Sequence, residues 1–177
     1  YGRRLMSNYF AVGLGLIDYL LEEFRPKDKR VYETKSQHKV RLVADEELLI
    51  KAQANADIWG VKHIGTIADI SKINKSITPA LYVVNTSNNP NAIGSIDSSD
   101  TQQWTVVVAV SNQAAQTNTV ELMQASGELI SKVINHVQGY QLDEYHDALE
   151  RTSTSGRPDY SSTFALYPFT FQTKFQP

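Results

Sequence analysis

The sequence predicts an α+β domain, a mixed and mainly antiparallel β-sheet with two main helices packed on it. Three observations in the second half of the chain favour this fold: an apolar run from Trp104 to Val110, an amphipathic stretch at 120–137, and a strand-like alternation from Phe164 to Phe175. A strand that is apolar on both faces needs cover on both sides. The 104–110 run is therefore predicted to lie in the middle of the sheet.

Length and composition favour a single domain spanning residues 1–177. The chain is 41% hydrophobic and 20% charged, which is enough apolar material for one sizeable core. It contains no cysteine, so disulfides, thiolate metal sites and thiol nucleophiles are excluded. No run approaches the roughly 18 to 20 apolar residues of a membrane span. We therefore expect a soluble protein that folds in a cytosolic environment and has no membrane partner.

The N-terminal part of the chain begins with a helical pattern. Apolar residues recur at helical spacing from Ser7 to Phe24, Ser7 or Asn8 is suited to cap the start, and Pro26 ends the helix. Residues 31–35 and 39–43 then alternate briefly between apolar and polar side chains. That pattern predicts two short strands or a hairpin.

The next segments lead to a buried strand. Acidic residues followed by strong helix formers predict a short helix at about 45–54. Residues 66–73 are expected to form one or two helical turns. The run from Pro79 to Asn85 is short, apolar and rich in β-branched residues. It predicts a buried strand with the proline at its first position.

A long polar segment follows, at 86–103, and is dominated by Ser, Asn, Asp and Gly. A loop of this length in a compact domain is usually functional or disordered. Because it joins two apolar strands, it is also suited to form an extended hairpin arm.

The remaining elements complete the predicted sheet. The helix at 120–137 has one apolar face, is expected to lie on the sheet, and is ended by Gly139. Residues 143–162 are polar and are expected to be loop-like. From Ala165 onward the odd positions are mostly apolar and the even ones mostly polar, which predicts a strand.

Positive charge is concentrated in one part of the chain, although the net charge is only −2. Between Arg25 and Arg41 there are seven basic residues against Asp28 and Glu33. The segment is interpreted either as a solvated loop or strand edge, or as a contact for an acidic partner or DNA. Only Tyr32 interleaves with these charges, so a platform for stacking bases is weakly supported.

No catalytic or metal-binding motif is recognisable. The four histidines lack metal-ligand spacing, and the serines lack the nucleophile-elbow pattern of hydrolases. Gly13-Leu-Gly15 falls inside the first helix and is not a dinucleotide fingerprint. An acidic stretch around His146 is compatible with acid–base or cation chemistry, but a solvated turn or helix is the favoured interpretation. The sequence therefore predicts no enzyme, no cofactor and no metal site.

The order of elements and several short phrases resemble a known family. The phrases are Pro79-Ala-Leu-Tyr-Val-Val, Gln103-Trp-Thr-Val-Val-Val-Ala-Val and the final Tyr167-Pro-Phe-Thr-Phe-Gln-Thr-Lys-Phe. Together with the N-terminal helix, they resemble the tail terminator proteins of long-tailed bacteriophages, including the Mu-type group. The resemblance covers residues 7–24 and about 63–177. Residues 25–62 have no clear counterpart and are interpreted as an insertion or a lineage-specific contact surface.

This resemblance implies a structural virion protein rather than an enzyme. Such proteins form a ring, typically of six subunits, that caps the growing tail tube, ends its polymerisation and docks to the head or connector. The implied partners are other copies of the chain, the tube protein, a connector or neck protein, and the sheath as a further candidate. The implied location is the tail or neck of the virion, assembled in the host cytoplasm.

Two other classes remain open: another neck or tail-completion protein, and a nucleic-acid-binding module. If the chain is a tail terminator, as the resemblance implies, the basic segment 25–41 and the polar segment 86–103 are expected to contact neighbouring subunits, the tube or the connector. The candidate interface residues are Arg25, Lys27, Lys29, Arg30, Lys35, Lys39, Arg41, Asn88, Asn89, Asn91, Asp97 and Asp100.

Overall fold

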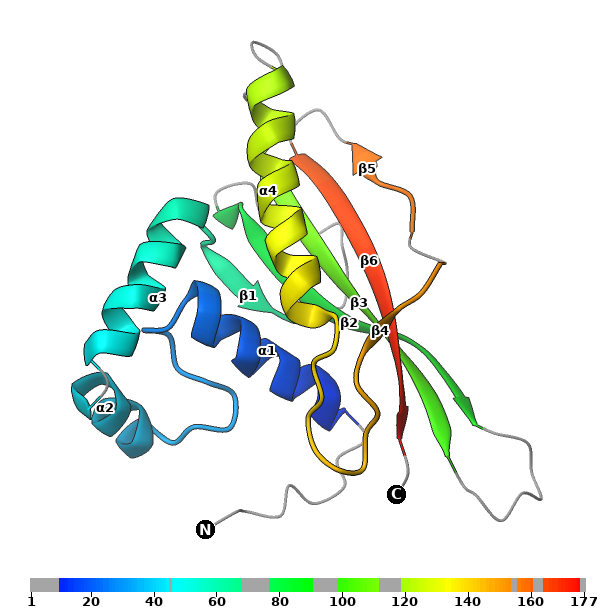
Figure 1. Ribbon diagram of the computed structural model, residues 1–177, viewed down its shortest axis with the longest axis horizontal. Coiled ribbons are helices and arrows are strands. Elements are labelled where there is room, and N and C mark those ends of the chain that lie inside the picture. The colour runs from blue at the N-terminus through cyan, green and yellow to red at the C-terminus, as the bar shows by residue number, and fades with distance from the viewer. Residues whose placement is uncertain are drawn as a thin grey trace.

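The computed structural model contains one sheet with helices against it (Figure 1). The structure describes residues 10–44, 46–67, 77–90, 99–111, 119–153, 156–160 and 164–175. Within these residues the α+β prediction is confirmed, because the sheet is mixed and mostly antiparallel.

Three long strands form the centre of the sheet and three short ones lie beside them. The central strand β3 pairs antiparallel with β2 on one side and β6 on the other. Strand β1 adds to β2 in parallel but pairs only with residues 80–82, and β4 and β5 pair with the outer edge of β6. The strands are β1 (His63–Gly65), β2 (Ala80–Pro90), β3 (Asp100–Ser111), β4 (Glu150–Arg151), β5 (Asp159–Tyr160) and β6 (Phe164–Phe175).

Helices α1 and α4 pack on the same face of the sheet, as Figure 1 shows. Their apolar side chains join those of the three long strands in one continuous core. Two further helices, α2 and α3, lie at the end of the molecule near the C-terminus of α1. The helices are α1 (Ala11–Phe24), α2 (Lys35–Ala44), α3 (Glu46–Trp59) and α4 (Thr119–Val137).

Strand β3 is buried on both faces, as the sequence predicts. Alternate residues, including Val106 and Val108, belong to the core under α1 and α4. The intervening Val107 and Ala109 belong to a second cluster on the opposite face, where Ile67 and Phe164 pack against them. The period-two pattern of β6 divides in the same way, because Ala165 joins the first cluster and Leu166 the second.

Helix α1 approaches the sheet closely at Gly13. A Cβ atom placed on this glycine would lie 2.1 Å from the Trp104 ring, and the Trp104 side chain is only 4% exposed. The absence of a side chain at Gly13 therefore lets the indole pack directly against the helix backbone. Trp104 thereby belongs to the core beneath α1.

Most of the remaining predictions are confirmed where the structure describes the chain. Helix α1 ends at Phe24, before Pro26, and α4 ends just before Gly139, whose φ is +84°. The polar segment begins as an extended hairpin, with β2 running to Pro90 and β3 starting at Asp100. The proposed caps Ser7 and Asn8, and most of the helical turns expected at 66–73, lie outside the described residues.

Two predictions are wrong. Residues 31–35 and 39–43 do not form strands, because α2 begins at Lys35 and continues through Ala44. Its start is fixed by a reciprocal capping box: the Gln37 backbone N–H donates to Thr34 Oγ1 at 3.2 Å, and the Thr34 backbone N–H donates to Gln37 Oε1 at 2.9 Å. The segment 143–162 is also not wholly loop-like, since β4 and β5 pair with β6.

We expect Gly13→Ala to destabilise the protein by about 1–3 kcal/mol, because the new methyl group would overlap the packed Trp104 ring. The matched control is Gly127→Ala in α4, where a Cβ meets nothing within 4 Å. Removing that glycine should stabilise the helix by roughly 0.5–1 kcal/mol. Urea unfolding of the two variants measures both effects. Equal stability of Gly13→Ala and the wild type would contradict this account of the packing.

Candidate interface surfaces

The arginines of the basic segment are engaged within the molecule. Arg25 forms an ion pair with Asp28 and donates from Nη1 to the Val61 carbonyl at 3.0 Å. Arg30 pairs with Glu22 of α1 at 3.3 Å. These contacts fasten the loop that follows α1, so two of the predicted interface residues have a structural role.

Arg41 of α2 holds the same loop from the other side. Its Nε and Nη2 atoms bind the two carboxylate oxygens of Glu33 at 2.7 and 3.0 Å. Its Nη1 and Nη2 also donate to the carbonyls of Pro26 and Asp28 at 2.6 and 3.0 Å. The Arg41 hydrogen bonds lower the pKa of Glu33 from 4.5 to about 2. A bidentate pair of this kind fixes both position and orientation.

Asp18 of α1 provides a third attachment for the loop. Its two carboxylate oxygens accept hydrogen bonds from the backbone N–H groups of Val31 and Tyr32. Burial nevertheless raises the pKa of Asp18, since the low-dielectric surroundings disfavour its charge. Asp18 thus orients the turn at residues 31–32 against α1.

The lysines of the basic segment point to solvent instead. Lys27, Lys29, Lys35 and Lys39 are all exposed, and none of the ion pairs among the described residues includes them. On α2, Lys35, Lys39 and Val43 follow one another at four-residue spacing, so they share one stripe of the helix. We call the four lysines, together with Val40 and Val43, the lysine surface.

The lysine surface also exposes apolar side chains. No residue of α2 is buried, and Val40 and Val43 are 66% and 79% exposed. Ile50 of α3 is 64% exposed. Scattered exposed apolar residues are ordinary, but a helix that buries nothing gains little from packing in the isolated chain.

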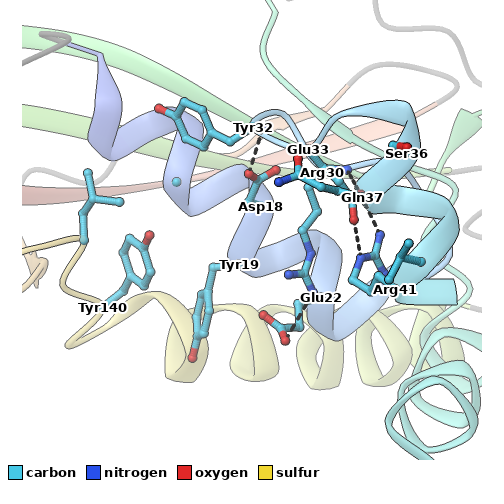
Figure 2. A pocket seen from close by; sticks show the side chains of 13 residues that line it. Asp18, Tyr19, Glu22, Arg30, Tyr32, Glu33, Ser36, Gln37, Arg41 and Tyr140 are labelled. Atoms are coloured by element: carbon cyan, nitrogen blue, oxygen red, sulfur yellow. Dashed lines mark hydrogen bonds and ion pairs between the residues drawn. The ribbon is translucent and has the colours of Figure 1, made fainter. Parts of the chain in front are cut away.

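A cavity of about 810 Å³ lies between α1, α2 and the loop after α4 (Figure 2). Tyr19 and Tyr140 stack on one side with ring centroids 4.8 Å apart. Across the cavity, the Glu22–Arg30 and Glu33–Arg41 pairs are drawn with dashed lines. Burial raises the pKa values of Tyr32 and Tyr140. The carboxylate and guanidinium groups that line the cavity bind one another or backbone groups, and these contacts hold the 25–41 segment against α1.

Residues 87–90 of β2 and 100–103 of β3 form the described part of the hairpin arm, which begins at a β-bulge. The β2–β3 register shifts between Asn85 and Ser87, and a bulge bends and twists the strand that contains it. At this point, Thr86, Thr105 and Thr170 link the three long strands through their hydroxyl groups, at 3.2 and 2.9 Å. Beyond it, the two strands extend away from the helices (Figure 1).

The predicted interface residues of the arm have different environments. Asn88 is exposed, but its amide is engaged in two hydrogen bonds with the Asn85 amide, at 2.7 and 3.0 Å. Asn89 is exposed and pairs with Thr101 in the ladder, and Asp100 is half-buried at the start of β3. Asn91 and Asp97 lie outside the described residues.

The acidic stretch after α4 is held on a buried histidine. His146 is 4% exposed, stacks on Phe175 at 4.7 Å, and its Nδ1 lies 2.6 Å from Asp143. The expectation of a fully solvated turn is therefore wrong for the histidine itself. The exposed residues of this stretch are Glu144, Tyr145, Asp147 and Glu150, which we call the acidic knob.

Within the described residues, the structure offers no obvious reaction centre. Among them, no three His, Cys, Asp or Glu side chains come together in a way that suits a metal ion. His146 and Asp143 form a pair, but no third His, Cys, Asp or Glu among the described residues joins them to complete a metal site. None of the described helices is both long and apolar enough to cross a bilayer.

Comparison with known proteins identifies the family. The family model for phage tail terminator proteins matches residues 43–177, which is most of the chain. The chain belongs to the phage tail terminator family. A comparison with curated individual proteins finds no match.

The matched range of the tail terminator family contains the whole sheet, α3 and α4. The resemblance seen in the sequence is thus confirmed at family level, while the narrower Mu-type grouping stays a prediction. The match begins within α2, so it includes part of the proposed insertion at 25–62. The family is one of structural tail proteins, and the described chain is accordingly interpreted in terms of contact surfaces.

Sequence reasoning missed the residues that organise the basic segment. Asp18 binds a backbone group 14 residues away and Glu33 binds a guanidinium group 8 residues away, and no helical or strand periodicity indicates such contacts. The start of α2 was detectable, because Thr34 and Gln37 have the spacing of a capping box. The exposed Val40 and Val43 would then have been visible as part of a helix surface.

We expect Glu33→Gln to lower the free energy of unfolding by roughly 1.5–3 kcal/mol at neutral pH, because Arg41 loses its charged partner. The folded-state pKa of Glu33 is depressed to about 2, so its contribution is present above the unfolded value of about 4.5 and is lost as pH falls toward 2. The difference between wild type and variant should therefore shrink below about pH 4.5.

Urea unfolding at several pH values measures this difference. The control is Glu128→Gln on the exposed surface of α4, which should change stability little at any of these pH values. A Glu33→Gln effect that is constant from pH 7 to about pH 2.5 would contradict the role given to the Glu33–Arg41 pair.

Proposed function

We propose that this tail terminator forms a closed ring, typically of six copies, on the end of the tail tube. The ring ends polymerisation of the tube and presents a docking face to the head, through a connector or neck protein, and to the sheath as a further partner. The protein then resides in the tail or neck of the virion after assembly in the host cytoplasm. The family match over residues 43–177 carries this proposal.

The hairpin arm supports the proposal because it projects away from the four described helices (Figure 1). Its base is fixed across three strands by the threonine hydroxyls at residues 86, 105 and 170. Its side chains beyond the bulge include the exposed Asn88 and Asn89. A rigidly anchored, polar projection suits contact with a neighbouring copy or with the tube, since little ordering is needed on binding.

A ring also follows from the geometry of termination. A tube that grows by adding identical layers stops when the last layer presents a different surface to incoming subunits. Copies joined head to tail by one heterologous contact close into a ring or continue as a filament, depending on the rotation between them. A closed ring on the tube end therefore ends growth without any chemistry.

Two other functions are compatible with parts of the structure. Another neck or tail-completion protein would use the same kind of ring but contact a different neighbour. The exposed lysines at 27, 29, 35 and 39 favour, less strongly, a nucleic-acid-binding module. Binding to DNA through these lysines would weaken steeply with salt, and a DNA titration at two salt concentrations distinguishes it.

We expect purified protein to cap polymerising tail tube protein, giving tubes of limited length with a ring at one end. Removing Asn88–Ser98 from the arm should leave the fold intact and reduce binding to the tube end. Negative-stain images and length distributions measure capping, and the solution mass across a concentration series measures ring formation.

A variant in which the same residues are replaced by a Gly/Ser linker of equal length separates the chemistry of the arm from its reach. Circular dichroism and melting temperature check that both variants fold. Tubes that grow equally long with and without the wild-type protein would refute termination. Normal capping by both arm variants would remove only the arm from the mechanism.

A further inference from the structure

We propose that the lysine surface of one copy binds the acidic knob of the next copy, and that this contact joins neighbours in the ring. The inference rests on the proposed ring and adds which surfaces meet. It is drawn from two exposed surfaces of opposite charge, each of which also carries exposed apolar side chains.

The lysine surface carries positive charges that are not neutralised within the described chain. The arginines beside it are neutralised: Arg25 by Asp28, Arg30 by Glu22 and Arg41 by Glu33. The lysines at 27, 29, 35 and 39 remain exposed and outside the ion pairs of the described chain. The Arg41 contacts with the Pro26 and Asp28 carbonyls hold the lysine-bearing turn against α2. The positive charges are therefore presented from a fixed framework.

The acidic knob is equally well fastened. Beneath it, buried His146 stacks on Phe175 and contacts Asp143. The Asp143 carboxylate also accepts from the Tyr145 backbone N–H at 3.0 Å, and the Gln141 amide donates to the His146 carbonyl at 2.8 Å. These contacts order the turn before any partner binds, which reduces the entropy cost of association.

The charge of the knob is predominantly negative. Glu144, Asp147 and Glu150 are exposed carboxylates in this turn and strand. The nearby exposed cations are Lys174, whose carbonyl accepts from the Asp147 backbone, and Arg151, whose guanidinium lies over the Phe169 ring at 5.3 Å. Arg151 and Glu150 are successive strand residues, so their side chains point to opposite faces.

Apolar groups on the two surfaces also match. Tyr145 of the knob is 54% exposed, while Val40 and Val43 of the lysine surface are 66% and 79% exposed. Tyr145 next to Glu144, meeting valines on the helix that carries Lys35 and Lys39, combines apolar with charged contacts, as protein interfaces usually do. A polyanion such as DNA would use the lysines but would leave the valines uncovered.

The lysine surface and the acidic knob are two different surfaces of the chain: residues 27–43 carry the first and residues 144–150 carry the second. The loop leading to the knob touches the N-terminal half of α1, where a Cβ at Gly15 would clash with Tyr140 and Leu142. The lysine-bearing loop is bound to the same helix through Asp18 and Glu22. Because the two surfaces consist of different residues, a contact between them in neighbouring copies is heterologous, as ring closure requires.

Charge reversal tests the pairing. One variant carries Lys35→Glu and Lys39→Glu, and a second carries Glu144→Lys and Asp147→Lys. Each alone should associate about tenfold or more weakly than wild type, because like charges face each other in every contact. Mixed in equal amounts, the two should assemble again, since each altered surface then meets a complementary one. A variant with all four substitutions should assemble alone.

Sedimentation velocity at low and high salt measures these associations, and the salt dependence should follow screening of exposed charges. The controls are Lys62→Glu and Glu128→Lys, which change the net charge at exposed sites outside both surfaces and should leave assembly unchanged. Recovery on mixing also establishes that both variants are folded.

Assembly of each reversed variant at wild-type strength would overturn the pairing, as would loss of assembly in both variants without recovery on mixing. If wild type still forms rings and caps tubes in those cases, the proposed function stands and only this contact fails. A wild-type protein that stays monomeric even with tube protein present would overturn both.

Discussion

The fold depends on the burial of β3 on both faces. The strand carries apolar side chains on both faces from Val106 to Val110, so it loses stability wherever either face is left in water. Its two edges are therefore occupied by β2 and β6, one face is covered by α1 and α4, and Ile67 and Phe164 pack against the other. Gly13 lets α1 approach closely enough to cover Trp104. The lysine surface, the acidic knob and the hairpin arm lie outside this packing.

The parts of the fold that could be predicted are those in which the spacing of apolar residues shows which side chains are buried. The two-faced strand at 104–110, the helix at 120–137 and the alternation from Phe164 have repeating patterns that only one environment satisfies. The order of these elements was also enough to suggest the family that the match over 43–177 supports.

The parts that could not be predicted are governed by single polar contacts. Helix α2 has no buried face, so hydrophobic periodicity contains no signal for it, and its start depends on the Thr34–Gln37 capping box. Which residues of the basic segment are held within the molecule depends on acidic side chains of α1 and of the loop itself, such as Asp18 and Glu33. A count of charges along the chain cannot separate paired from unpaired groups.

The arginines of the basic segment are paired and the lysines are not, and this difference follows from the chemistry of the two side chains. Guanidinium groups present a planar set of donors that suits carboxylates and carbonyls at once, whereas an ammonium group is compact and strongly hydrated. Arg41 accordingly binds Glu33 and two backbone carbonyls, while Lys35 and Lys39 stay in solvent on the same helix. The basic segment thereby has arginines that hold the loop in place and lysines that present positive charge to solvent.

Because β1 is short, most of the outer edge of β2 is not paired with another described strand. Because β1 pairs only with residues 80–82, the outer main-chain groups of β2 from Val83 to Pro90 have no partner strand among the described residues. An exposed strand edge can pair with a strand of another chain and so promote aggregation. The bulge near Thr86 and the proline at position 90 interrupt the regular spacing that such pairing needs. The outer edge of β2 is thus accessible, but its irregular backbone disfavours regular pairing with a further strand.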